Sequence, residues 1–138
     1  MDSDAAWQAV SDFTLPAAVI IKHANPCGAA TSASGLVKAY TKALATDPVS
    51  AFGGIVAFNR PVDKATAEEL AKIFLEVIMA PAFDAAAIDI LSAKKNVRLL
   101  EISTASGKYV SGYDFRRVAG GLLLQERDNI PFDIRQAK

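Results

Sequence analysis

Three segments of the chain carry residues whose types and spacing could do chemistry. Lys22–Gly28 offers an ammonium, the single imidazole of the protein and its single thiol, while Ser50–Gly54 places Phe52 before a glycine pair. Glu76 stands just before an apolar run. In open α/β sheets, ligands gather beyond the carboxyl ends of strands. Because these segments flank predicted strands, we expect them to converge on one edge of a sheet.

The residue types in Lys22–Gly28 show whether this segment could bind zinc or supply a cysteine nucleophile. His23 with Pro26-Cys27 is similar to the H-x-E and P-C-x-x-C motifs that hold zinc in deaminases. Here Asn25 stands two positions after His23 and no second cysteine follows Cys27, so the sequence excludes that zinc site. A Cys27 nucleophile with His23 as its base is the other alternative, although nothing in the sequence indicates a lowered thiol pKa.

Each of these residues also has an ordinary structural interpretation. A lone lysine leaving a strand is usually solvated, and a lone histidine at such an edge more often forms a structural hydrogen bond than a catalytic one. Asn-Pro and Pro-Cys-Gly are common turn sequences, and a glycine pair permits a tight bend. Taken singly, Phe52 is then a core residue and Glu76 a surface carboxylate, so only their combination favours function.

The elements that must position these residues alternate between helix and strand. Apolar periodicity predicts helices over 4–12 and about 34–45, a third beginning at Asp63 or Thr66 with Leu70, Ile73 and Phe74 on its apolar face, and a fourth from Asp84 with basic residues at its end. Short apolar runs predict strands at 17–21, 55–58, 77–80, 97–102 and 118–125, with a loop at 25–28. Strands separated by helices predict a largely parallel sheet with helices on both faces.

Composition narrows the class of protein. The chain has 138 residues, which suits a single domain. Its 15 basic residues balance 15 acidic ones, so no overall charge favours nucleic acid or anionic lipid. No apolar run approaches the ~20 residues that cross a bilayer, and the acidic first residues are unlike a secretory signal. We expect a soluble, cytoplasmic α/β domain.

Five strings in one order carry a family resemblance over nearly the whole chain, from DAAW near its start. The chain strongly resembles the bifunctional purine-biosynthesis family that combines AICAR transformylase with IMP cyclohydrolase. The strings are IKHANPCG, DPVSAFGGIVAFNRPVD, EVIMAP, ILSAKKNVRLL and GGLLLQERD. Several long motifs in sequence are more specific than any single one.

The resemblance implies a fold and a place within the family. Residues 1–138 are similar to the first of two transformylase halves, each of which has a cytidine deaminase-like fold without zinc. Nothing in the chain matches the cyclohydrolase domain or the second half, so we expect a truncated piece with little activity by itself.

The resemblance also implies a reaction and its residues. Family members transfer a formyl group from 10-formyltetrahydrofolate to the 5-amino group of AICAR ribonucleotide, and no metal is required at the site. His23 matches the catalytic histidine and Lys22 the lysine that stabilises the transition state. Gly53 and Glu76 match nucleotide-binding positions. The same motifs include Asn25 and Phe52.

Partners follow from the same resemblance. Family members are homodimers, and the folate-contacting residues belong to the second half, so we expect the chain to associate with the rest of the transformylase domain or with itself. The alternative hypothesis is a non-catalytic nucleotide-binding or assembly module, in which the Lys22-His23 pair only holds a phosphate.

Overall fold

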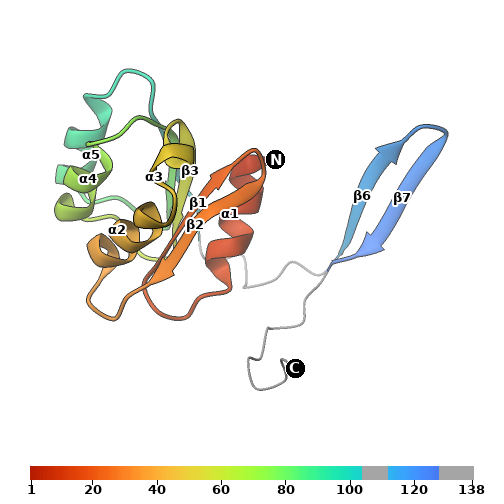
Figure 1. Ribbon diagram of the computed structural model, residues 1–138, viewed down its shortest axis with the longest axis horizontal. Helices are drawn as coiled ribbons and strands as arrows, with labels where there is room; N and C mark the ends of the chain where they lie inside the picture. Colours follow the sequence, from red (N-terminus) through yellow and green to blue (C-terminus); the bar gives the residue numbers. More distant parts are fainter. Residues whose placement is uncertain (104–111, 128–138) are drawn as a thin grey trace. The chain divides into compact units, whose positions relative to one another are not determined.

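Five strands of the first part of the chain form one sheet in the order β2-β1-β3-β4-β5 (Figure 1). The computed structural model describes residues 1–103 and 112–127, and the chain divides into two compact units, 1–103 and 104–138. The strands of the sheet are β1 (Ala17–Lys22), β2 (Asn25–Thr31), β3 (Gly54–Phe58), β4 (Leu75–Ala80) and β5 (Arg98–Glu101).

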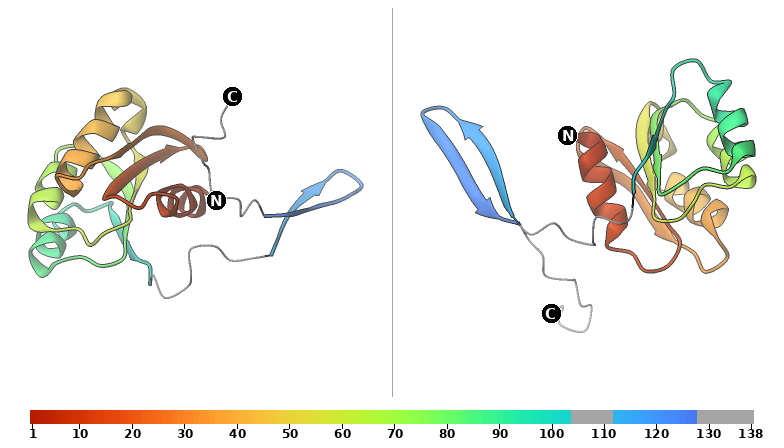
Figure 2. Two further views of the ribbon diagram at one scale, coloured as in Figure 1. Left: turned by 90° about the horizontal axis from the view of Figure 1, so that it is seen from below. Right: turned by 180° about the vertical axis from the view of Figure 1, so that it is seen from behind.

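Helices cover both faces of this sheet, as the two views of Figure 2 show. One face packs on α1 through Ala6 and Val10, and the other packs on the remaining helices around Tyr40, Phe58 and Leu91. The helices are α1 (Asp2–Ser11), α2 (Leu36–Thr46), α3 (Pro48–Ala51), α4 (Lys64–Leu70) and α5 (Ala85–Ser92). The predicted α/β class, a layered sheet with helices on both faces, is confirmed.

The direction of strand pairing corrects one expectation. β3, β4 and β5 are parallel, with α4 and α5 as the crossovers, but β1 pairs antiparallel with both β2 and β3. Only half of the pairings are therefore parallel. Ala17–Ile21 are buried on both faces, so the apolar run of β1 reflects a central position in the sheet and not parallel pairing.

Residues 25–28 form the start of β2 and not the loop predicted for them. Asn25 pairs with Lys22 and Gly28 with Ile20, and the register shifts between these pairs so that Cys27 has no partner on β1. β2 lies at the edge of the sheet, where a proline can be accommodated because one side of the strand forms no ladder. The turn chemistry of Asn-Pro therefore marks a bulged edge strand.

Several helix ends also differ from the sequence prediction. Asp63, one of the two predicted starts, caps α4 by accepting the Thr66 backbone N–H at 2.8 Å. α4 then ends at Leu70, so Ile73 and Phe74 lie beyond the helix whose apolar face they were expected to extend. α5 likewise ends at Ser92, and its basic residues follow the helix instead of completing it.

The second unit contains a hairpin of β6 (Tyr113–Val118) and β7 (Gly121–Glu126). The single strand predicted over 118–125 thus corresponds to β7 and the turn before it, whereas β6 was missed. A two-stranded hairpin cannot bury a core of its own. That residues 1–138 make one domain, the first half of a transformylase, stays a prediction.

In the ranges that the structure describes, no helix combines the length and apolar character needed to cross a membrane.

Candidate functional site

A tight hairpin turn carries the only histidine. β1 ends at Lys22, and His23 and Ala24 form the two-residue connection to Asn25 of β2. Both turn residues have positive φ, 52° for His23 and 60° for Ala24. Glycine and asparagine adopt this conformation most easily, so a histidine-alanine pair here costs about 1–2 kcal/mol per residue. The Asn25 side chain supports the turn by donating to the His23 carbonyl at 3.0 Å.

This turn orients the two residues predicted to be catalytic. Successive strand residues point to opposite faces, so a regular β1 would separate the Lys22 and His23 side chains. The reversal falls at His23-Ala24 and not at Asn25-Pro26, where the sequence placed it. The His23 imidazole is exposed, and within the described residues it has no hydrogen bond to Gly53 or Glu76. Its catalytic role stays a prediction.

Lys22 is bound to the glycine bend that precedes β3. Its Nζ donates to the Phe52 carbonyl at 2.8 Å and to the Gly53 carbonyl at 3.1 Å. Gly53 has φ 68°, and a Cβ added there would lie 3.0 Å from that same Nζ. The positive φ of Gly53 favours glycine because a side chain there would strain the backbone, whereas the flexible end of Lys22 could shift to make room.

Antiparallel pairing of β1 and β3 brings these residues together. Lys22 ends β1 and Gly53 precedes β3, and in an antiparallel pair those two ends meet. With parallel strands they would lie at opposite edges, a strand length of ~15 Å apart. The predicted convergence of Lys22, Phe52 and Gly53 is confirmed, at the carboxyl end of β1 and the amino end of β3.

The short helix α3 sets the position of the bend. Asp47 caps it, accepting the Ser50 hydroxyl at 2.6 Å and the Ser50 backbone N–H at 3.0 Å, and Pro48 opens its first turn. These hydrogen bonds from Ser50 hold the pKa of Asp47 below its usual value. Because α3 ends at Ala51, the cap controls where Phe52 and Gly53 begin.

Phe74 completes the site, a role that the sequence did not predict. The Gly53 N–H donates to the Phe74 carbonyl at 2.8 Å, and the Phe52 and Phe74 rings lie 5.6 Å apart at 56°. Phe52 is 61% exposed and Phe74 37%, so Phe52 is not the core residue of its ordinary interpretation. The only sequence signal for this role is that Phe74 stands two residues before Glu76, a predicted site residue. In the structure Phe74 lies beyond α4, which ends at Leu70.

Glu76 lies next to this aromatic pair. Gly54 pairs with Leu75 and Ile55 with Val77, so Glu76 is the extra residue of a bulge in β4. Its exposed side chain lines a hollow together with Phe74 and Arg98. Lys22, Phe52 and Gly53 thus meet directly, Glu76 follows through Phe74, and His23 and Asn25 occupy the adjoining turn.

The thiol of Cys27 is poorly suited to nucleophilic attack. Burial raises the pKa of Cys27, and its Sγ lies 3.6 Å from the Ile20 carbonyl as a weak donor. A thiol with a raised pKa holds little thiolate at neutral pH. Among the described residues, no group of three histidine, cysteine, aspartate or glutamate side chains could hold a metal ion.

Two comparisons relate the chain to known proteins, one to a protein family and one to a solved structure of similar fold. The family model described as "AICARFT/IMPCHase bienzyme" matches residues 1–138. The solved structure of Acinetobacter baumannii RibD, form 1, is similar with a TM-score of 0.51 at 15% sequence identity, over 71% of this chain and 32% of the RibD chain. The chain thus spans about a third of RibD, and at this identity the likeness concerns the fold alone, in agreement with the predicted deaminase-like layering.

Proposed function

The chain belongs to the AICARFT/IMPCHase bienzyme family, and from that premise we propose that it forms part of the formyl-transfer site of an AICAR transformylase. Family membership places it in purine biosynthesis. The reaction proposed for it moves the formyl group of 10-formyltetrahydrofolate to the 5-amino group of AICAR ribonucleotide. The single observation that carries the proposal is the Lys22 ammonium, held at 2.8 Å and 3.1 Å on two carbonyls beside a glycine that cannot be replaced without strain.

The chemistry needs two kinds of group. The 5-amino lone pair is delocalised into the imidazole ring and the carboxamide, so the amine is a poor nucleophile. Its attack on the formyl carbon puts positive charge on nitrogen and negative charge on oxygen. A base must take the proton from nitrogen, and a cation must stabilise the oxyanion or help the folate nitrogen to leave.

Lys22 is the proposed cation. An ammonium has three N–H donors, and the Phe52 and Gly53 carbonyls accept two of them. One donor is left for an oxyanion, and the two fixed bonds hold the charge in place before the reaction begins. Preorganised charge of this kind is a large contribution to transition-state stabilisation.

His23 is the proposed base. A neutral imidazole has one ring nitrogen with a free lone pair, which can accept the amine proton. The positive φ of His23 and Ala24 supports this role, since strained backbone is concentrated at functional sites.

The nucleotide is proposed to lie along the glycine bend and the aromatic pair. Gly53 lets a ligand approach the backbone, the exposed Phe52 ring offers a stacking surface, and Glu76 can accept hydrogen bonds from ribose hydroxyls or amide hydrogens. Asn25 would act through the His23 turn that it holds. 10-Formyltetrahydrofolate, the second transformylase half and a homodimeric or self-associated state are proposed partners.

The roles are tested by His23→Ala in a full-length family member that carries this segment. We expect formyl transfer to fall by roughly 10²–10⁴-fold, the usual contribution of general acid–base catalysis, with cyclohydrolase activity unchanged. Lys64→Ala, on the exposed surface of α4, is the matched control. Full transfer activity in the His23 variant would remove the imidazole from the mechanism.

The same variant separates catalysis from binding. If AICAR affinity falls while the rate at which bound substrate reacts does not, the segment is the non-catalytic nucleotide-binding module of the alternative hypothesis.

The 138-residue chain by itself should show little formyl transfer, because the proposal assigns the folate contacts to the second half. Near-normal turnover by the purified chain would contradict this division.

A further inference from the structure

A groove runs along the domain edge next to Phe74. It consists of two adjoining hollows that share four lining residues, Phe74, Lys95, Asn96 and Val97. One hollow extends to Lys72 and Lys94, and the other to Glu76 and Arg98. We call this surface the basic groove. Its walls come from the segments that lead into β4 and β5, so it follows the amino ends of two parallel strands.

The groove concentrates positive charge in a chain that has none in excess. Four cations line it, Lys72, Lys94, Lys95 and Arg98, against the single carboxylate of Glu76. The whole chain balances 15 basic with 15 acidic residues. Lys72 is neutralised by Glu69 at 2.6 Å, which still leaves three groove cations against Glu76. A concave surface of one sign raises the local concentration of counter-ions.

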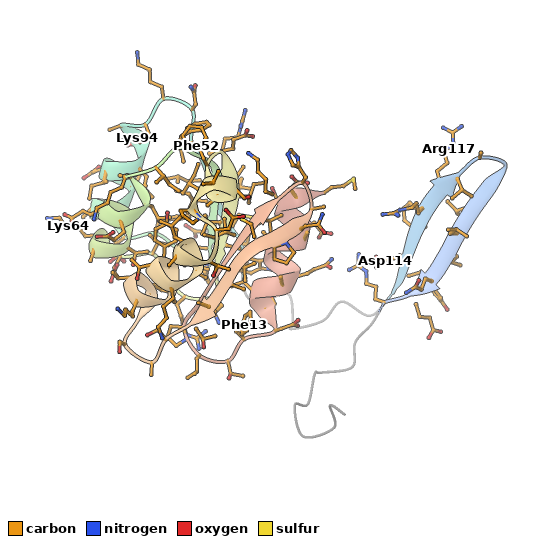
Figure 3. All side chains as sticks on the ribbon, in the orientation of Figure 1. Phe13, Phe52, Lys64, Lys94, Asp114 and Arg117 are labelled. Carbon is orange, nitrogen blue, oxygen red and sulfur yellow. The ribbon has the colours of Figure 1, made fainter. Side chains whose placement is uncertain are left out.

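The basic groove is continuous with the candidate site. Phe74 lines both hollows, and the same residue accepts the Gly53 N–H and packs its ring on Phe52. Glu76 likewise belongs to the site and to the groove. In Figure 3, Lys94 and Phe52 lie at the same upper edge of the domain. A ligand bound at the Phe52–Gly53 bend can therefore extend directly into the groove.

We propose that the basic groove binds an oxyanion group, phosphate or carboxylate, of the ligand that occupies the Lys22–Gly53 site. Lys95 and Arg98 supply the charge, the Asn96 amide adds a neutral donor, and Glu76 takes the hydroxyl or amide hydrogens next to the anion. The inference rests on the proposed function, whose two substrates both carry such groups. A nucleotide would bring a phosphate and a folate the carboxylates of its glutamate.

The first experiment needs no catalysis. Inorganic tripolyphosphate and a γ-linked triglutamate peptide are titrated into the 138-residue chain while backbone amide resonances are followed by NMR. We expect shifts centred on Lys95–Arg98 with at least one probe, and a loss of affinity of roughly 10-fold or more in Lys95→Ala/Arg98→Ala, because hydrogen bonds to charged groups are the strong ones. Raising the salt concentration should weaken binding as the charges are screened.

The matched control is Lys64→Ala, because Figure 3 shows Lys64 projecting from α4 away from Phe52 and Lys94. An equal loss in this control, shifts spread over the whole surface, or no shifts with either probe would overturn the proposal. All substituted side chains are exposed, so each variant should keep the wild-type spectrum without ligand.

The second experiment identifies the source of the anion and separates this inference from the proposed function. The affinities of AICAR ribonucleotide and of its dephosphorylated nucleoside are measured for the wild-type chain and for Lys95→Ala/Arg98→Ala. If the phosphate occupies the groove, the double substitution weakens the nucleotide and leaves the nucleoside unchanged. If the triglutamate alone responds, the folate is the source. If the groove binds the anion but His23→Ala has no effect on formyl transfer, only the catalytic proposal is contradicted. If His23→Ala slows formyl transfer as expected but the groove binds no anion, only the groove proposal is contradicted.

Discussion

β3 and β7 begin with similar residues and end in opposite environments. Gly54–Phe58 reads GIVAF and lies in the sheet, with Val56, Ala57 and Phe58 fully buried, whereas Gly121–Glu126 reads GLLLQE and is exposed throughout. Both form strands because branched and apolar side chains suit extended backbone. The difference shows that an apolar run predicts a strand but leaves open what the strand packs against.

Both faces of the hairpin carry exposed apolar side chains. Cross-strand pairs place Tyr113, Phe115, Leu122 and Leu124 on one face together with Arg117 and Glu126, while Val118 and Leu123 share the other face with Asp114, Arg116 and Gln125. The apolar members of the first face are between 57% and 74% exposed. Arg127 adds an ion pair to Asp114 at 2.9 Å. Each face of the hairpin thus mixes apolar with charged side chains, whereas the sheet of residues 1–103 is covered by helices on both faces.

The largest expected difference between the two regions comes from removing a phenylalanine ring. Phe58→Ala should destabilise residues 1–103 by about 3–5 kcal/mol, because it leaves a cavity beside Tyr40, whose ring lies 6.1 Å away. Phe115→Ala, its matched change in the hairpin, should stay within about 0.5 kcal/mol because the ring is 74% exposed. Urea unfolding followed by circular dichroism measures both. Equal losses would mean that Phe115 is buried in solution.

A smaller difference is expected from adding one methyl group. A Cβ at Gly28 would clash with the Ala43 carbonyl of α2, so Gly28→Ala must push the helix from β2 and should cost about 1–3 kcal/mol. Gly121→Ala meets no atom within 4 Å and should change stability by less than about 0.5 kcal/mol. Thermal unfolding of the two variants provides the measurement. A Gly28 variant as stable as the wild type would mean that α2 is not closely packed there.

The smallest difference concerns two aspartates and depends on pH. Asp47→Ala removes the α3 cap and should lower the thermal midpoint of residues 1–103 at neutral pH, whereas Asp114→Ala removes only an exposed ion pair. Hydrogen bonds from Ser50 lower the folded-state pKa of Asp47, so its stabilisation is present above the ordinary carboxyl pKa. It is lost as the pH falls through the lowered folded-state pKa.

Midpoints measured from neutral to strongly acidic pH should therefore show the Asp47→Ala deficit shrinking with acid. A deficit that grows with acid would contradict the sign of the pKa shift. Because α3 leads into the bend, the same variant should loosen the Lys22 contacts with Phe52 and Gly53, which is visible as a change in their amide resonances.

Much of the fold was predictable from the sequence for identifiable reasons. β1, β3 and β4 were found because their runs are apolar throughout, as strands buried on both faces require. α2 was found because Leu36, Val37, Tyr40 and Leu44 repeat at helical spacing, and of these Leu36 and Tyr40 are buried. β2 was missed because Pro26 and Gly28 are loop residues by composition, and only an edge position with a bulge makes them a strand. Local composition cannot reveal which strand is at the edge.

The candidate site shows the same division. The sequence by itself determined the side chains available to it: the Lys22-His23 pair, a glycine bend after Phe52, a carboxylate at Glu76 and the family to which these motifs belong. Tertiary structure alone decided that β1 runs antiparallel to β3, which brings the Lys22 ammonium onto the Phe52 and Gly53 carbonyls, and that Phe74 joins them. The sequence lists the residue types directly. Strand direction, however, depends on the free energies of contacts between segments about thirty positions apart, which a local sequence pattern does not contain.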